Sequence, residues 1–252
     1  MYRLLSLIPL LILTSPATAG WYRVTNYTGH LGDAAVHLSL QVYSFGSGLN
    51  VEGSYYYDRY RSPIVLYGKL DGDQLALCEI HDTRTFSRII EQGSKSGFDT
   101  TACPLQLTLT GQGANGKWHD RHHTLAVNLS RAGQLNDDHP AHGSAELKIP
   151  FWGQTAYHTF VGLYRTEQGN VSIDRVDVIS KASGKVVQRF NPNAHECGFG
   201  FTMTPIYMNL QTASPRGPEQ IVLTCYSQRG DRSAIYTFNP DSGRFVFTPP
   251  GA

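Results

Sequence analysis

Apolar and polar side chains alternate along most of this chain. Leu38, Leu40 and Val42 share one face of a segment that begins at His37. Two similar segments flank Asp71-Gly72-Asp73, and an Asp-Gly pair is typical of a tight hairpin because both residues tolerate a positive φ. A period of two indicates β-strands. Strand candidates are 37–42, 51–57, 64–70, 74–80, 104–110, 124–129, 145–149, 157–164, 171–179, 186–190, 199–210, 220–226, 234–238 and 244–247.

One short segment also fits a helix. In residues 83–91 the side chains of Phe86, Ile89 and Ile90 share a helical face, and Gly93 is placed to end the helix. A strand remains an alternative for so short a segment. With this exception the pattern predicts an all-β fold with little helix.

A polar stretch divides the strand candidates into two groups. Residues 131–144 contain Gly and Pro and almost no large apolar side chain, which is typical of a loop or linker. We therefore expect an N-terminal β domain at 20–131, a linker at 132–144 and a C-terminal β domain at 145–252. Each would be antiparallel and barrel-like or sandwich-like, with a blade-like form as an alternative for the second.

The first residues have the pattern of an export signal. Arg3 precedes an apolar run at 4–13, and Ala17-Thr18-Ala19 resembles a cleavage site, so we expect a signal peptide at 1–19. The run of about ten apolar residues is short of the roughly 20 that a spanning helix needs. A periplasmic or secreted location without membrane insertion follows as an expectation.

The cysteines fit an oxidising compartment. All four lie after the signal, and four cysteines allow three pairings. We favour Cys78 with Cys103 and Cys197 with Cys225, because each pair then lies within one half of the chain. A metal site is the rival interpretation, but the chain has no C-x-x-C and the spacings are long.

Charge and motifs give no support for several functions. A net charge of +1 with 16% charged residues argues against nucleic acid as a partner. Residues 111–116 match G-x-G-x-x-G, but a strand candidate follows where a dinucleotide site needs a helix, so a hairpin turn is favoured. At 93–97, Lys95 occupies the position where G-x-S-x-G needs its serine. We expect no enzyme.

The chain is rich in histidine, which raises the question of a metal site. Two groups stand out, and both lie where a turn or linker is expected, so we interpret them as solvated loops and expect no metal or other cofactor. They are His119, Asp120, His122 and His123, and Asp137, Asp138, His139 and His142.

Aromatic side chains suggest a binding surface. Tyr55, Tyr56 and Tyr57 are consecutive in a strand candidate, so both faces of that strand carry a tyrosine. Tyrosine buries a large area at low entropy cost and adds a directional hydroxyl. Tyr55 and Tyr57 are therefore candidate protein-binding residues, with ordinary packing as the alternative.

Two sets of segments carry family resemblances. The first set is 27–29, 51–57, 64–68, 70–72, 75–79, 116–118 and 125–129. Through these segments the N-terminal half resembles secreted lipocalin-like β-barrel proteins of unassigned function. The second set is 183–188 and 236–246. Through these segments the C-terminal half resembles the lysozyme-inhibitor-like immunity proteins of the periplasm, which protect bacteria from peptidoglycan hydrolases delivered by type IV secretion.

The second resemblance implies a binding loop. Residues 231–236 are similar to the inhibitory loop of invertebrate-type lysozyme inhibitors, which implies roles in protein binding for Asp231, Arg232, Ser233 and Tyr236. Arg232 would pair with a catalytic carboxylate of the hydrolase. The family's acidic, calcium-type loop corresponds to 209–219, where nearly all carboxylates are missing, so calcium is not expected.

Three functions remain as hypotheses. The first is a non-enzymatic periplasmic inhibitor or immunity protein that binds a cell-wall hydrolase of lysozyme type. The second is a lipocalin-like envelope protein that binds a small apolar or carbohydrate ligand. The third is a structural envelope protein without a discrete site. An inhibitor needs an exposed polar loop, whereas a small-ligand binder needs an enclosed pocket.

Overall fold

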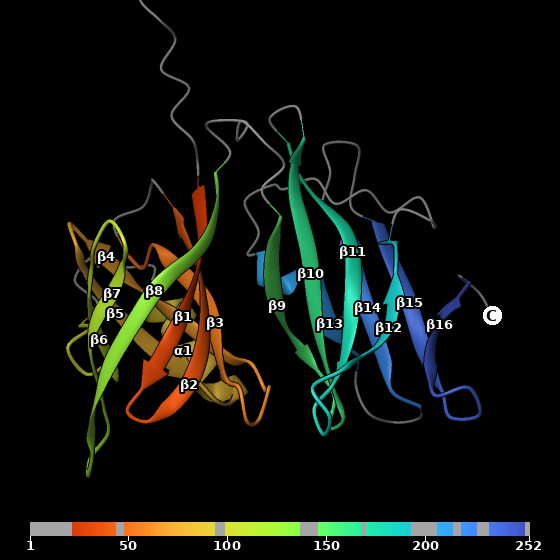
Figure 1. Ribbon diagram of the computed structural model, residues 1–252, viewed down its shortest axis with the longest axis horizontal. Coiled ribbons are helices and arrows are strands. Elements are labelled where there is room, and N and C mark those ends of the chain that lie inside the picture. Colours follow the sequence, from red (N-terminus) through yellow and green to blue (C-terminus); the bar gives the residue numbers. More distant parts are fainter. Residues whose placement is uncertain are drawn as a thin grey trace, which may run out of the picture.

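The protein consists of a closed β-barrel followed by a pair of smaller sheets (Figure 1). The computed structural model describes residues 22–43, 48–93, 99–136, 146–167, 170–192, 206–213, 218–225 and 232–249. Every strand pairing in these ranges is antiparallel, so the predicted all-β antiparallel class is confirmed. The expected signal peptide lies outside them.

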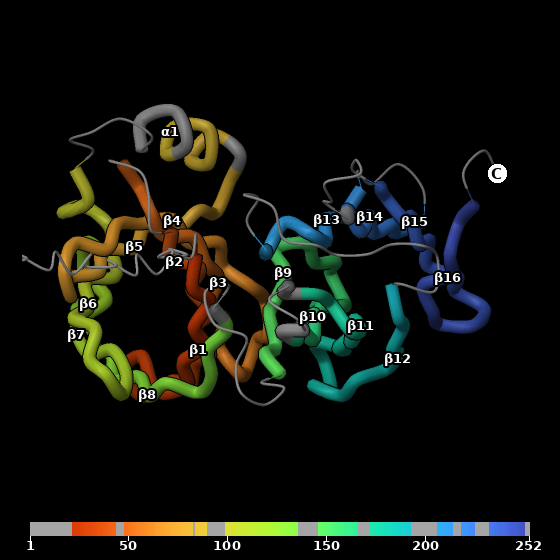
Figure 2. The backbone as a smooth tube through the Cα atoms, turned by 90° about the horizontal axis from the view of Figure 1, so that it is seen from above, coloured from red at the N-terminus to blue at the C-terminus, as the bar shows by residue number. Residues whose placement is uncertain are grey.

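Eight consecutive strands form the barrel. Each strand pairs with the next along the chain, and β1 also pairs with β8, so the ring closes without a free edge (Figure 2). The strands are β1 (Tyr22–Leu31), β2 (Ala34–Tyr43), β3 (Val51–Tyr57), β4 (Ile64–Asp71), β5 (Gln74–Ile80), β6 (Leu105–Leu109), β7 (Gly113–His119) and β8 (Thr124–Asn136).

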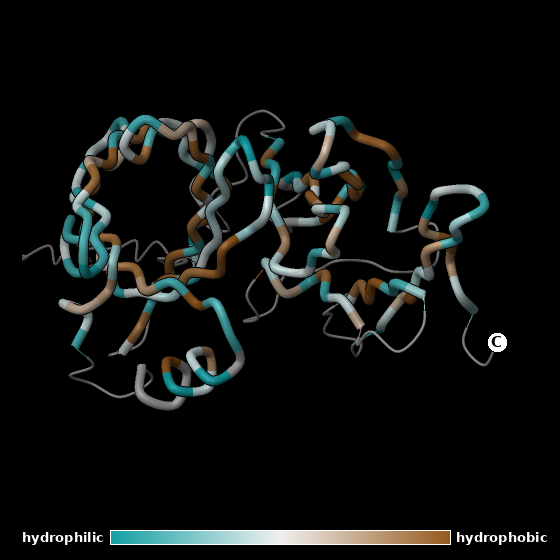
Figure 3. Tube along the Cα trace, turned by 90° about the horizontal axis from the view of Figure 1, so that it is seen from below, coloured by the Kyte–Doolittle hydropathy of each residue, from teal (hydrophilic) through white to brown (hydrophobic). Residues whose placement is uncertain are grey.

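Alternation along these strands fills the barrel with apolar side chains. Hydropathy changes from residue to residue around the ring in Figure 3, as expected when one face of each strand is turned inward. Gly72 has a φ of 61° in the β4–β5 turn, which matches the Asp-Gly hairpin predicted there. The buried core residues are Tyr27, Leu31, Val36, Leu38, Leu40, Val51, Tyr55, Leu66, Leu75, Leu77, Leu105, Leu107, Ala114, Val127 and Leu129.

Helix α1 (Thr83–Gly93) covers part of the outer wall of the barrel. The helical alternative for this segment is therefore right. The Asp82 carboxylate accepts a hydrogen bond from the Thr85 backbone N–H at 2.7 Å and caps the helix. Ile89 packs in a small core with Tyr67 and Ile80 of the wall. No helix in the described ranges is both long and apolar enough to cross a membrane.

A disulfide fastens the wall next to this helix. Cys78 of β5 is bonded to Cys103, with a Cα–Cα distance of 4.3 Å, as the predicted pairing requires. The second predicted pair involves Cys197, which lies outside the described residues, so that pair stays a prediction.

Two four-stranded sheets follow the barrel and share one core. The Gln188 side chain joins them, because its amide donates to the Phe245 carbonyl at 2.7 Å and accepts from the Phe245 N–H at 2.8 Å. The core residues include Phe151, Phe160, Tyr164 and Tyr207. The first sheet contains β9 (Leu147–Gln154), β10 (His158–Glu167), β11 (Asn170–Ser180) and β12 (Val186–Phe190); the second contains β13 (Leu210–Thr212), β14 (Gln220–Cys225), β15 (Arg232–Asn239) and β16 (Arg244–Thr248), preceded by the turn η2 (Ile206–Asn209).

A β-bulge in β8 makes this strand part of both cores. Asn26 pairs with Gly133 and Tyr27 with Arg131, so Ala132 is an extra residue. An extra residue reverses which side chains point inward. Leu135, beyond the bulge, therefore points outward and joins the core of the two sheets. The strand also runs five residues into the expected linker 132–144, because its polar residues pair with β1 through the backbone, which needs no apolar side chains.

Hydrogen bonds connect the outer wall of the barrel to the two sheets. Ser39 and Tyr207 share a hydroxyl–hydroxyl bond of 3.0 Å, and Ser54 donates to the Pro150 carbonyl at 3.1 Å. The Trp152 indole N–H donates to the Gly53 carbonyl at 2.9 Å. Groups of β2 and β3 on the outside of the barrel therefore form the joint that connects it with β9 and η2.

The joint also encloses a carboxyl group, that of Glu52 on β3. The Tyr43 hydroxyl donates to Glu52 Oε2 at 2.9 Å, and Tyr67 is a second hydrogen-bonding partner. Burial raises the pKa of Glu52 to about 7, although these hydrogen bonds act in the opposite direction. The Trp152 ring stacks on the Tyr207 ring with the centroids 5.8 Å apart, and its centroid lies 5.4 Å from that of Tyr67. Trp152 therefore covers this side of the wall.

Candidate functional site

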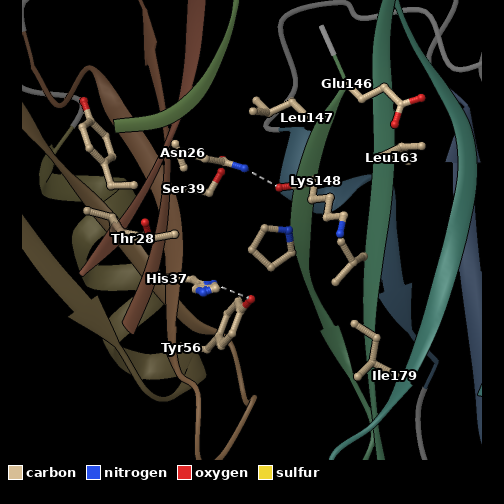
Figure 4. A pocket seen from close by; sticks show the side chains of 15 residues that line it. Asn26, Thr28, His37, Ser39, Tyr56, Glu146, Leu147, Lys148, Leu163 and Ile179 are labelled. Atoms are coloured by element: carbon tan, nitrogen blue, oxygen red, sulfur yellow. Dashed lines mark hydrogen bonds between the residues drawn. The ribbon is translucent and has the colours of Figure 1, made fainter. Parts of the chain in front are cut away.

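A cleft of about 420 Å³ lies between the outer wall of the barrel and the first sheet (Figure 4). It exists because the hydrogen bonds of the joint hold the two surfaces side by side without filling the space between them. The barrel side contributes Asn26 and Thr28 of β1, His37 and Ser39 of β2, and Tyr56 of β3; the facing side contributes Leu147, Lys148 and Pro150 of β9, Val161 and Leu163 of β10, and Ile179 of β11.

The two walls of the cleft differ in chemistry. The barrel wall presents an imidazole, a phenol, hydroxyls and an amide, because these residues occupy the outward positions of their strands. The facing wall is mainly apolar, formed by Pro150, Val161, Leu163 and Ile179. A ligand in this cleft would meet hydrogen-bonding groups on one side and aliphatic groups on the other.

His37 and Tyr56 form the polar centre of the barrel wall. His37 Nδ1 and the Tyr56 hydroxyl are hydrogen-bonded at 3.0 Å, and His37 Nε2 lies 3.5 Å from Asp58 Oδ1. Burial lowers the pKa of His37, and Asp58 opposes this only in part. Burial raises the pKa of Tyr56 to about 12. Both side chains are therefore mainly neutral at pH 7.

Asn26 bridges the two walls at one end of the cleft. Its Nδ2 donates to the Lys148 carbonyl at 2.6 Å, which Figure 4 shows as a dashed line. Its Oδ1 is buried and has no hydrogen-bond partner within the described ranges. A buried acceptor without a donor costs free energy. The Asn26 Oδ1 can therefore accept a hydrogen bond from a ligand at this end of the cleft.

Arg61 lines a smaller hollow next to the cleft. It is a non-glycine residue with a φ of 52°, and its guanidinium donates to the Lys181 carbonyl at 3.0 Å. Its own carbonyl accepts from the Thr159 hydroxyl. The hollow has a volume of about 260 Å³ and shares His37 and Tyr56 with the main cleft. The loop between β3 and β4 thus connects the barrel with β10 and the β11–β12 turn.

Charged groups occupy the rim of the cleft. Arg165 forms an ion pair with Glu146 and lies 3.6 Å from Asp174. Lys148 adds a positive charge on the same side. These charges have both signs, and Lys148 is exposed, so solvent screens its charge.

Tyr55 and Tyr57, predicted as protein-binding residues, point into the barrel instead. Tyr55 is 3% exposed and Tyr57 is half-buried at the end of the barrel. The alternation was predicted correctly, but the face that carries these two tyrosines lines the interior of a closed ring. Tyr56, on the opposite face, lies in the cleft.

The interior tyrosines surround a carboxylate that the sequence interpretation did not select. Glu79 Oε1 accepts hydrogen bonds from the Tyr55 hydroxyl at 2.6 Å and from the Trp118 indole N–H at 2.7 Å. Glu79 Oε2 lies 3.0 Å from His81 Nε2. A signal was present, because Glu79 follows Leu75 and Leu77 on the apolar face of its strand.

The residues of the predicted inhibitory loop are placed in different environments. Arg232 and Ser233 are exposed at the start of β15, where they pair with Cys225 and Thr224. Tyr236 is 3% exposed and its ring stacks on Phe190 at 4.6 Å, so it contributes to the core and not to a contact surface. Asp231 lies outside the described residues.

The candidate metal groups show turn geometry in the part that the structure describes. The Asp120 carboxylate accepts the backbone N–H groups of His122 and His123 at 2.7 and 2.6 Å, closing the β7–β8 hairpin. Among the described residues, no group of three or more His, Cys, Asp or Glu side chains could hold a metal ion. The second histidine group, within 137–145, lies outside them.

The G-x-G-x-x-G match at 111–116 is a hairpin, as favoured. The strands β6 and β7 pair directly across it, and the Thr110 hydroxyl accepts the Gly113 N–H at 3.0 Å.

The comparison of the chain with family models, curated proteins and solved structures found no match. The function has to be argued from the geometry of the chain itself.

Proposed function

We propose that this protein is a non-enzymatic binding protein of the cell envelope that holds a small neutral carbohydrate in the cleft between the barrel and the first sheet. The observation that carries the proposal is the cleft of about 420 Å³ with one polar and one apolar wall. Small-ligand sites typically have volumes of about 300–1,000 Å³ and often lie where two structural units meet.

The polar wall suits hydroxyl groups. His37, Tyr56 and Thr28 can each donate or accept, and a sugar hydroxyl does both. The apolar wall suits the C–H face of a sugar ring, which would pack on Pro150 and Val161. One ligand class with both characters at this size is a mono- or disaccharide.

The charge state of the cleft supports a neutral ligand. The His37 imidazole is mainly uncharged at pH 7 because burial lowers its pKa, and the Tyr56 phenol stays protonated. On the facing side Glu146 pairs with Arg165, and Lys148 is exposed at the edge of the cleft, where solvent screens its charge. A charged ligand would lose its hydration without gaining a fixed counter-charge.

Calorimetric titration of the full chain with saccharides tests this proposal. Maltose and chitobiose are suitable probes, and saturable binding of at least one of them is expected. Tyr56→Phe should weaken that binding about fivefold, because a neutral hydrogen bond contributes about 1 kcal/mol. The matched control is Tyr157→Phe, since Tyr157 is 71% exposed and outside the cleft. Equal affinity in both variants, or no saturable binding by folded protein, would reject the cleft as the site.

A second candidate is inhibition of a cell-wall hydrolase, which the exposure of Arg232 and Ser233 favours. An exposed arginine at the start of a strand can pair with a catalytic carboxylate in the cleft of a glycosidase. This candidate predicts stoichiometric suppression of a lysozyme-type muramidase without turnover of peptidoglycan. Arg232→Ala should weaken the inhibition and the exposed control Arg244→Ala should not. Failure to inhibit any muramidase would leave saccharide binding as the proposal.

A further inference from the structure

The end of the barrel lumen contains a buried carboxyl group, that of Glu79. The Glu79 side chain is 9% exposed and lies in the layer above Leu77, which is fully buried. Replacing a buried charged group together with its partners by apolar side chains of similar volume is often neutral or stabilising, because the desolvation of the charge is avoided. A carboxylate kept in an apolar lumen is therefore a candidate for binding.

The two oxygens of Glu79 are held in different ways. Oε1 receives two short hydrogen bonds, at 2.6 Å from Tyr55 and at 2.7 Å from Trp118, and both donors come from opposite parts of the wall. Oε2 has His81 as its partner at 3.0 Å, and the His81 side chain is 63% exposed. One oxygen is thus fixed by the core, while the partner of the other can move into solvent.

Aromatic rings lead from this carboxylate to the surface. Tyr57 lies edge-on to Tyr55 with the ring centroids 5.6 Å apart, and Tyr60 lies edge-on to Tyr57 at 6.3 Å. Tyr60 is 60% exposed in the loop between β3 and β4. A carboxylate at the inner end of a row of aromatic rings is an arrangement that recognises an organic cation, through charge and through the ring faces.

We propose that this end of the barrel binds an alkylammonium group. The positively charged head group would take the place of His81 beside Glu79 Oε2, held by its charge, and its carbon substituents would lie against Tyr57 and Trp118. The site is separate from the cleft, which lies on the outer face of the wall, and its ligand class differs. The inference therefore stands or falls independently of the proposed carbohydrate binding.

Paired probes test the proposal on the full chain. Calorimetric titration uses choline and, separately, the neutral alcohol in which carbon replaces the quaternary nitrogen. Choline should bind saturably and at least about tenfold more tightly than the alcohol, because only the cation interacts with Glu79. The Trp118 indole N–H signal in the nitrogen–proton spectrum, identified by Trp118→Phe, should shift during the choline titration.

Variants separate a binding role from a structural one. Glu79→Gln keeps an oxygen that can accept both aromatic hydrogen bonds and should abolish the preference for choline, while Glu146→Gln, at an exposed carboxylate, should not. His81→Ala should bind choline at least as tightly as the wild type. Equal binding of the two probes, no saturable choline binding, or loss of binding in His81→Ala would overturn the proposal, even if Glu79→Gln failed to fold.

Discussion

Glu52 and Glu79 are buried carboxyl groups on opposite sides of the same barrel wall. Glu52 faces outward and is covered by the second half of the molecule, where Tyr43 and Tyr67 hydrogen-bond to it and burial raises its pKa to about 7. Glu79 faces inward at the end of the lumen and retains an exposed partner, His81. Glu52 is covered, so its protonation is the property that can change with pH. Glu79 has an exposed partner, so a ligand can replace that partner.

Removal of the Trp152 ring, which covers Glu52, should have the largest effect on the free energy of unfolding. Trp152→Ala deletes a ring that stacks on Tyr207 and an indole that donates to the Gly53 carbonyl. Truncating such a residue typically costs about 3–5 kcal/mol. We expect this loss in the free energy of unfolding from urea titration. The pKa of Glu52, followed by carboxyl NMR, should fall as water reaches it; an unchanged pKa would mean that Trp152 does not provide the burial.

The pH dependence of stability should report Glu52. Its pKa is raised on folding from an ordinary 4.5 to about 7, so the folded state binds the proton more tightly than the unfolded state. The stabilisation is fully present below pH 4.5 and is lost as the pH rises through 7. The loss amounts to about 3 kcal/mol for a shift of this size.

Glu52→Gln is the variant that isolates this dependence. The amide cannot ionise, so the difference in unfolding free energy between wild type and variant should change across the same pH window. Relative to the wild type, the variant should be more stable above pH 7 than it is below pH 4.5. Glu146→Gln is the control, because Glu146 is exposed. Parallel stability curves for wild type and Glu52→Gln would contradict the enclosed carboxyl.

Neutralising the inward carboxylate should have a smaller effect. In Glu79→Gln the amide oxygen can still accept the hydrogen bonds from Tyr55 and Trp118. We expect the free energy of unfolding to change by about 1 kcal/mol or less. Thermal denaturation at pH 7 measures it. A loss as large as that of Trp152→Ala would indicate that Glu79 is a structural element of the lumen.

The smallest effect should come from the exposed partner. His81→Ala removes a hydrogen-bond partner of Glu79 Oε2 whose side chain is 63% exposed, so water can take its place. A hydrogen bond that water replaces contributes about 1 kcal/mol or less, so the midpoint of urea unfolding should stay close to that of the wild type. A marked destabilisation would show that His81 is fixed in place and not available for exchange.

Strand positions follow from the sequence because period-two alternation is a local property. The hairpin at Asp71-Gly72-Asp73 and the helix ending at Gly93 were predicted from neighbouring residues alone, and the structure has both. Closure of the barrel was not predictable in this way, because it depends on pairing between the first and last strands. The face that carries Tyr55 could therefore be assigned to a strand but not to the inside of a ring.

The candidate sites illustrate the same limit. The cleft combines His37 and Tyr56 with Val161 and Ile179, which are brought together only when the barrel packs on the first sheet. Glu79 was recognisable in principle, since an acid in register with Leu75 and Leu77 breaks the apolar face of its strand. Its partners Tyr55 and Trp118 come from other strands, and no local pattern joins them.

The extra residue at Ala132 has a consequence for how the molecule melts. Because of the bulge, β8 contributes Leu129 to the interior of the barrel and Leu135 to the core of the two sheets. Neither core can be dismantled without disturbing a strand that the other one needs. We therefore expect a single calorimetric transition whose van't Hoff and calorimetric enthalpies agree, as for one cooperative unit. This is expected although the barrel and the two sheets are separate pieces of architecture.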